Sequence, residues 1–165
     1  MTQILQLGRL EARIEAVGGG VRVTLAGRLD DSSLLGKLAV RLPPGDVAID
    51  CGGITFVNSF GVREWTLLVR ALRDQGTVTL ERVTDALMTQ MNPIPEFAPP
   101  VRITSFYAQY VCPTCGAEPL PLVDAIAHAD ELAAMRAPPI PCAECGAEME
   151  LADFPERYLG LFCPD

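Results

Sequence analysis

The sequence lacks the features of a membrane-spanning or exported chain. It has no apolar run near the roughly 20 residues that a membrane-spanning helix needs. Residues 1–17 do not place a basic start ahead of an unbroken apolar stretch, so no export signal is expected. These absences predict a cytoplasmic protein without membrane contact, whose cysteines stand in a reducing compartment.

Positive charge is scarce. Lys and Arg number 13 against 21 Asp and Glu, which gives a net charge of −8, and Lys37 is the only lysine. Nucleic-acid binding depends on Lys and Arg side chains that neutralise phosphates. We therefore expect no nucleic-acid partner.

Residues suited to catalysis are few as well. The sequence has a single histidine, His128, and no recognisable nucleophile motif that would form a catalytic site with it. It also has no phosphate-binding Gly-Lys-Ser/Thr loop. The glycine run 18–20 is interpreted as a hairpin turn. The sequence predicts a protein that is not an enzyme, with His128 in a surface or packing role.

Cysteine, by contrast, follows a clear pattern. Two residues separate Cys112 from Cys115, and two separate Cys142 from Cys145. Four thiolates in two such pairs are typical of a tetrahedral Zn²⁺ site, with Zn–S distances of about 2.3 Å. Because all four ligands come from the protein, no position remains for a reacting water. We predict one structural zinc, with an iron–sulfur cluster or disulfide pairing as the alternatives.

The spacing between the pairs is unusual. It spans 26 residues, from Gly116 to Pro141, which exceeds a common zinc-ribbon spacing. We expect an inserted helix there, capped by Asp124 and running to about Arg136. Of the other cysteines, Cys51 is predicted to be an inert core thiol, and Cys163 a free terminal thiol or a fragment of another knuckle.

Hydrophobic periodicity predicts a leading hairpin and then strands that alternate with helices. Trp65 lies on the apolar stripe of the second helix and is expected in the core. The segments Asp31–Ser33 and Ser59 are expected to cap the first and second helices. The expected strands are 10–16, 21–25, 46–50, 54–57, 77–81 and 101–110, and the expected helices are 34–42, 62–72 and 84–92.

This order predicts the fold class α/β (α+β), a mixed β-sheet with helices packed on it. We expect one domain over 1–108, with a proline-rich loop at 93–100, and a zinc-ribbon-like module with an inserted helix over 109–165. The segment 149–162 is strongly apolar. It is expected either to pack on the protein itself or to form a dimer or partner surface.

Three features within residues 8–108 resemble the STAS domain of bacterial anti-sigma factor antagonists. They are the strand Val23–Asp30, Asp50 at the end of an expected strand, and the loop–helix junction Asn58–Gly61. The resemblance implies a mixed sheet of four or five strands with helices on one side. It also implies docking to an anti-sigma factor that is a serine kinase. The partner surface carried over to this sequence is Asn58, Ser59, Phe60, Gly61, Val62 and Arg63.

The junction departs from the family pattern at one position. Family antagonists carry a phosphorylated hydroxyl residue just before the glycine, whereas this sequence has Phe60 there. Phosphorylation adds about −1.5 to −2 charges and breaks an interface by repulsion and desolvation. Phe60 cannot accept a phosphate, and Ser59 is either a helix cap or a shifted phosphosite. Phe60 itself is either an exposed partner anchor or part of the core.

These observations predict a bacterial, non-enzymatic regulatory protein–protein interaction module. It resembles an anti-sigma factor antagonist but lacks the usual phosphorylatable residue. A structural scaffold or homo-oligomer subunit is the first alternative, and a sensor of zinc or thiol oxidation is the second.

Overall fold

A computed structural model describes residues 1–97 and 101–164 of the chain. Three antiparallel strands come first: β1 (Thr2–Leu7), β2 (Leu10–Val17) and β3 (Gly20–Leu29). The β2–β3 hairpin was expected, because apolar and polar residues alternate along both strands. Strand β1 was not expected, because Ile4 and Leu5 are adjacent and break the alternation that marks a half-buried strand.

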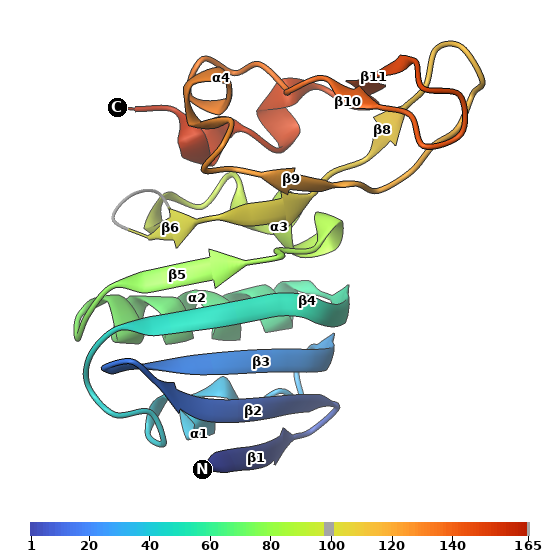
Figure 1. The fold of residues 1–165 in the computed structure, drawn as a ribbon. Helices are drawn as coiled ribbons and strands as arrows, with labels where there is room; N and C mark the ends of the chain where they lie inside the picture. Colours follow the sequence, from blue (N-terminus) through green and yellow to red (C-terminus); the bar gives the residue numbers. More distant parts are fainter. Residues whose placement is uncertain (98–100, 165) are drawn as a thin grey trace.

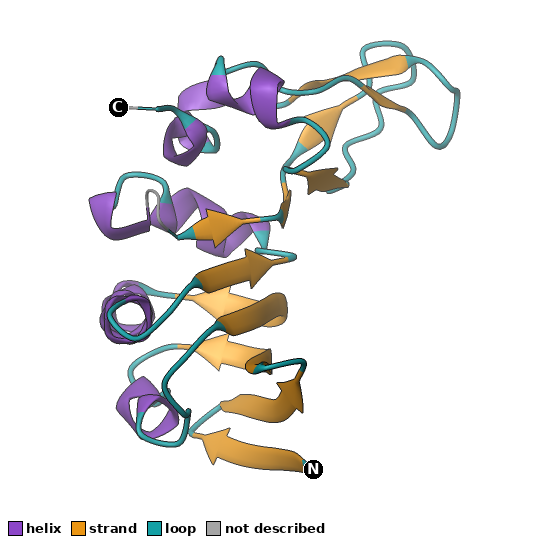
Figure 2. Cartoon of the chain, turned by 60° about the vertical axis from the view of Figure 1, so that its left-hand side comes forward, coloured by secondary structure: helices purple, strands orange, loops and turns teal. Residues whose placement is uncertain are grey.

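The second half of the sheet is parallel. Strand β3 pairs with β4 (Val47–Val57), β4 with β5 (Val78–Glu81), and β5 with β6 (Arg102–Ile103), so the order is β1-β2-β3-β4-β5-β6. Helices α1 (Leu35–Ala39), α2 (Ser59–Arg73) and α3 (Asp85–Met91) connect the parallel strands. Crossovers of one hand return each helix to the same face, and Figure 2 shows these helices on one side of the sheet. The predicted mixed sheet with packed helices is confirmed.

Several boundaries differ from the sequence-based expectation. The strands expected at 46–50 and 54–57 are one strand, because Gly52-Gly53 interrupts the apolar pattern but not the pairing, and Gly53 still lies opposite Ala26. Helix α1 is shorter than expected. Its N-cap is Leu34, with φ 36°, and no side chain caps it, so the expected cap at Asp31–Ser33 was wrong. The hydroxyl of Ser32 donates to the Asp30 carboxylate, and the hydroxyl of Ser33 accepts from the N–H of Asp30.

The C-terminal part begins where the expected long strand 101–110 divides into three. Strand β7 (Ser105–Tyr107) pairs with β9 (Leu122–Asp124), and β8 (Tyr110–Val111) joins a small sheet in the order β10-β11-β8. The two other strands of that sheet are β10 (Ile140–Pro141) and β11 (Glu148–Leu151). Strand β6 thus has only two residues, and β7 keeps one parallel bridge beyond β5, from Phe106 to Val83, while its other edge pairs with β9.

The helix expected at 124–136 is also shorter. Helix α4 covers Ala129–Ala133, and Asp124 ends strand β9. The Asp124 carboxylate accepts hydrogen bonds from the backbone N–H groups of Ile126 and Ala127, so it stabilises a turn rather than capping a helix. Two short 3₁₀ turns, Pro155–Arg157 and Gly160–Phe162, follow β11.

The proline-rich segment 93–100 falls partly within the described residues. Pro95–Phe97 forms a 3₁₀ turn, whereas 98–100 lie outside the described residues. Phe97 is buried.

One hydrophobic core extends from the sheet into the C-terminal part. Trp65 is fully buried in it, as expected, and so are Phe106 and Tyr110. In the apolar tail, Tyr158 and Leu161 are buried and the rings of Phe106 and Phe162 lie 5.3 Å apart, although Phe154 is 77% exposed. The tail therefore packs mainly on the protein itself. The division at residue 108 stays a prediction.

Among the described residues, no helix has the length and apolar character needed to cross a membrane.

Candidate metal centre and docking surface

The two cysteine pairs form two loops of the same geometry, one after β8 and one between β10 and β11. In the first, the N–H of Cys112 bonds to the carbonyl of Ala117 (2.8 Å), and the N–H of Gly116 bonds back to Cys112 (2.9 Å). The second loop repeats both bonds from Cys142 and Gly146, at 2.7 and 2.8 Å. Gly116 and Gly146 have φ 77° and 78°, a left-handed conformation that glycine adopts without strain.

The loops bring the four predicted ligands together. All four sulfur atoms lie within 4.8 Å of one another. The Sγ atoms of Cys112 and Cys145 are 3.5 Å apart, and those of Cys115 and Cys142 are 3.6 Å apart. A tetrahedron with metal–sulfur distances of about 2.3 Å has edges of about 3.8 Å, so this spacing fits a four-thiolate metal site. All six cysteines are free, so the disulfide alternative is absent from the structure.

The thiols of the cluster shift one another's pKa values in opposite directions: that of Cys112 is lowered, and those of Cys115 and Cys145 are raised. Hydrogen bonds from the backbone N–H groups of Cys115 and Thr114, and from neighbouring thiols, lower the pKa of Cys112 to about 6. The N–H of Ala117 acts in the same direction on Cys115, but the sulfur atoms of Cys112, Cys142 and Cys145 hold its proton and raise its pKa to about 12. The thiols therefore share protons, which a bound cation would displace.

The cluster is half embedded in the protein. Cys112 and Cys142 are buried, whereas Cys115 and Cys145 are exposed. His128 is not part of it. Its Nδ1 lies 3.2 Å from the carboxylate of Glu131, in agreement with the expected surface or packing role.

The predicted docking loop lies at the start of α2. The side chain of Asn58 accepts a hydrogen bond from the N–H of Gly61 (2.9 Å), so Asn58 is the N-cap. The expectation that Ser59 caps this helix was wrong. Ser59 is the first helical residue and is exposed, one position too late for the extended backbone that an N-cap adopts.

Gly61 is explained by packing. A Cβ atom at this position would lie 1.9 Å from the carbonyl oxygen of Leu29. The start of α2 therefore presses directly on the end of β3, and only glycine permits that approach.

The six predicted partner-surface residues divide between the outside and the core. Phe60 is 63% exposed, and Ser59 and Arg63 are exposed, whereas Val62 is 8% exposed and faces the core. The exposed face of α2 runs on from this point, with four residues at helical spacing: Phe60, Arg63, Leu67 and Arg70.

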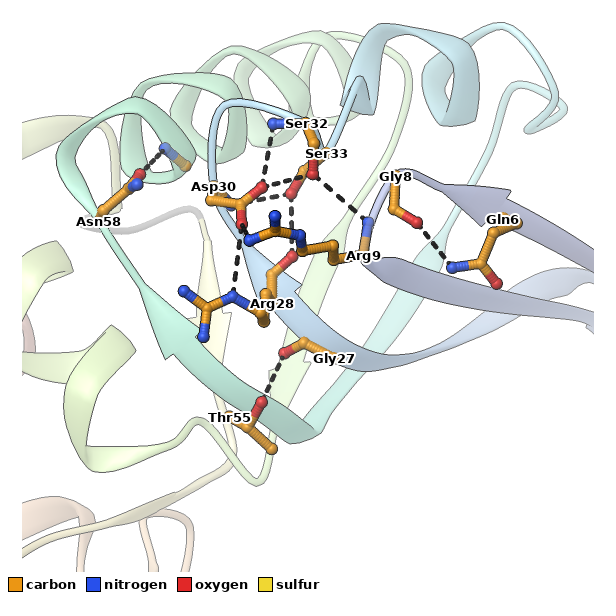
Figure 3. A network of polar contacts seen from close by, with 11 residues as sticks. Gln6, Gly8, Arg9, Gly27, Arg28, Asp30, Ser32, Ser33, Thr55 and Asn58 are labelled. Atoms are coloured by element: carbon orange, nitrogen blue, oxygen red, sulfur yellow. Dashed lines mark hydrogen bonds and ion pairs between the residues drawn. The ribbon is translucent and has the colours of Figure 1, made fainter.

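A buried polar network supports the loop before α1, at the end of β3, beside the start of α2 (Figure 3). The carboxylate of Asp30, which is 3% exposed, accepts hydrogen bonds from the N–H and hydroxyl of Ser32 at 2.9 and 2.6 Å. These bonds, with ion pairs to Arg28 and Arg9, lower the pKa of Asp30. Ser33 accepts from the N–H of Asp30 and donates to the carbonyl of Arg28.

Sequence reasoning missed a second network on the helix-free face of the sheet. Asp50 of β4 accepts two hydrogen bonds from Arg82, at 3.0 and 2.8 Å, and lies 3.6 Å from Arg22. Arg22 also pairs with Glu81 at 2.6 Å. Asp50 and Arg82 are 32 residues apart, so only the parallel pairing of β4 with β5 brings them together.

No protein-family model matches the chain, and no curated protein matches it either. The likeness to STAS domains therefore rests on the residues quoted above, and family membership stays a proposal.

Proposed function

We propose that Cys112, Cys115, Cys142 and Cys145 hold one structural Zn²⁺. Thiolate ligands select soft or borderline metals, and a closed set of four sulfurs leaves no site for a reacting water. The sulfur spacing described above is the observation that carries this proposal. The ion would close the two loops on each other and so fix β8, β10 and β11, which have few residues of their own.

Native mass spectrometry of the whole chain, with and without chelator, tests the metal. One zinc per chain, lost on chelation, is the expected result. Cys115→Ser should lower zinc occupancy, whereas Cys163→Ser, the matched control outside the cluster, should keep it. Visible absorption together with bound iron and sulfide would show that the cysteines hold an iron–sulfur cluster instead of zinc. A chain that binds no metal would refute the site.

We propose further that the protein is a non-enzymatic regulatory module that docks a partner protein through the start of α2. The observation that carries this is the outward position of Phe60 on a rigid base. Asn58 caps the helix, Gly61 fits against β3, and the Asp30 network holds the adjoining loop. Aromatic residues, phenylalanine included, are enriched at the centres of protein interfaces, where a few residues carry most of the binding energy.

The expected partner is a protein of the anti-sigma factor kinase type, by similarity to STAS antagonists. With phenylalanine at position 60, binding would proceed without the phosphorylation that releases family members from their kinases. The protein would then be a constitutive partner in a sigma-factor or stress-signalling network.

Titration against purified anti-sigma factor kinases from the source organism tests this function. Phe60→Asp should weaken binding about 30-fold or more, because a hot-spot aromatic contributes about 2 kcal/mol or more. Phe154→Asp, an equally large change at an exposed phenylalanine far along the chain, should leave binding unchanged. Equal affinities of the wild-type chain and Phe60→Asp would refute docking at this surface.

A further inference from the structure

The large sheet has one covered edge and one uncovered edge. Beyond β6, the chain continues into the C-terminal part, and the N–H of Ala125 bonds to the carbonyl of Thr104 there. Beyond β1, no segment of the described chain pairs with the outer side of the strand. Figure 1 shows β1 alone at that end of the molecule. An uncovered strand presents a row of unpaired N–H and C=O groups, which is a template for another strand.

Strand β1 also lacks the features that usually prevent edge pairing. Its six residues carry no charge and no proline, and its register with β2 runs unbroken from Thr2 opposite Glu15 to Leu7 opposite Leu10. Natural edge strands are usually protected by charged residues, prolines or bulges. The neighbouring β2, with Glu11, Arg13 and Glu15, is charged, so the uncharged edge is a local property of β1.

Apolar surface gathers at this edge. Ile4 is 56% exposed and lies opposite Arg13 on the helix-free face of the sheet. On the other face, α1 contacts β1, and Val40 at the end of α1 is 81% exposed. The edge therefore offers an uncovered apolar side chain, Ile4, on the helix-free face, beside its unpaired backbone groups.

We propose that β1 pairs antiparallel with β1 of a second copy of this chain, which joins two sheets into one continuous sheet of twelve strands. Residues that lie opposite each other must share a face, so the two-fold axis passes through a residue of β1. An axis at Ile4 places Ile4 against Ile4 of the second copy and Thr2 against Gln6, and leaves one mixed pair, Gln3 against Leu5. An axis at Leu5 places Leu5 against itself but leaves two mixed pairs, Ile4 against Gln6 and Gln3 against Leu7. The Ile4 register is therefore assigned.

A second copy is favoured as the occupant because the strand complements itself. In the Ile4 register, an apolar residue meets its own image and the polar residues flank it on the same face. The protein carries a net charge of −8, so two copies repel each other in general. They approach with least repulsion along an uncharged strand. This inference concerns a surface separate from α2 and does not depend on the docking proposal.

Sedimentation velocity over a concentration series of the full chain tests the pairing. The wild-type chain should form a dimer in the micromolar range. Ile4→Lys and Ile4→Glu should each weaken dimerisation about tenfold or more, because each places like charges opposite each other. Phe154→Lys, which adds the same positive charge as Ile4→Lys at an exposed position elsewhere, should dimerise as the wild type does.

Mixing the two charged variants separates a specific pairing from misfolding. Ile4→Lys and Ile4→Glu together should form a mixed dimer, since a two-fold at Ile4 sets the opposite charges against each other. A wild-type chain that stays monomeric would overturn the proposal. So would a dimer that survives Ile4→Lys, or a mixture that stays as dissociated as its components.

Discussion

At the scale of single residues, Asp50 shows how a buried charge is retained. Burial would raise its pKa, but hydrogen bonds from Arg82 and from the N–H of Gly52 outweigh burial and hold the pKa below its ordinary value. Arg82 reaches Asp50 from a left-handed backbone conformation, with φ 47°. A non-glycine residue rarely adopts this conformation, so surrounding contacts must hold it in place.

We expect Arg82→Met to lower the free energy of unfolding by about 1–3 kcal/mol at neutral pH. The substitution leaves a buried carboxylate without two charged hydrogen bonds. The loss is limited because the Arg82 side chain is 45% exposed and Arg22 remains near Asp50. Urea unfolding measures the difference. The exposed Arg102→Met serves as the control and should change stability by less than about 0.5 kcal/mol.

The difference in stability between the wild type and Arg82→Met should depend on pH. A carboxyl group whose pKa is lowered on folding stabilises the folded state at pH values above its ordinary pKa, about 3.9. That contribution is lost as the pH falls through the lowered pKa. The difference in the free energy of unfolding between wild type and Arg82→Met should therefore become smaller in acid. Both chains share the same cysteine cluster, so metal release affects them alike, and a gap that stays constant with pH would contradict the role given to Asp50.

At the scale of elements, helix α2 depends on its first turn. We expect Asn58→Ala to cost about 1 kcal/mol of stability, because the N–H of Gly61 loses its only cap. Ser59→Ala, one residue away and exposed, should cost only a few tenths of a kcal/mol, within the range of surface substitutions. Thermal or urea unfolding distinguishes them, and a larger loss for Ser59→Ala would restore serine as the cap.

The elements that sequence predicted well are those with a regular pattern. The β2–β3 hairpin follows alternation, α2 follows an apolar stripe, and the metal cluster follows the cysteine spacing. Strand β1 was missed because its apolar residues are adjacent, and β7, β8 and β9 are too short to carry a period. The networks of Asp30 and Asp50 were missed because their partners meet only through strand pairing and loop packing.

At the scale of the whole molecule, the C-terminal tail returns to the large sheet and contacts α3. The hydroxyl of Tyr158 donates to the carboxylate of Asp85 at the start of α3, and the side chain of Asn92 at its end accepts from the N–H of Leu161. The apolar side of the tail is buried in the shared core. The metal loops, the tail and α3 are thus mechanically linked.

Removing the metal should therefore destabilise the parts of the chain in order, the C-terminal part first. Structural zinc contributes apparent free energies of about 10–16 kcal/mol in small zinc peptides, and β8, β10 and β11 have only two to four residues each. We expect chelation to expose the backbone amides of 105–162 to hydrogen exchange first. Helix α3 should follow in part, because it loses the contacts of Tyr158 and Leu161. Strands β2 to β4 should stay protected, since Leu25 and Ile49 are fully buried at the centre of the large sheet.

Hydrogen-exchange mass spectrometry of the full chain, with chelator and reductant, measures this order, and added zinc should reverse it. Exchange confined to the C-terminal part and α3 would support the predicted division near residue 108, because two units of different stability then share the core. Simultaneous exposure of β2 to β4 would make the chain one cooperative unit and refute the division. Unchanged protection throughout would mean that the apolar tail, rather than the metal, holds the C-terminal part on the sheet.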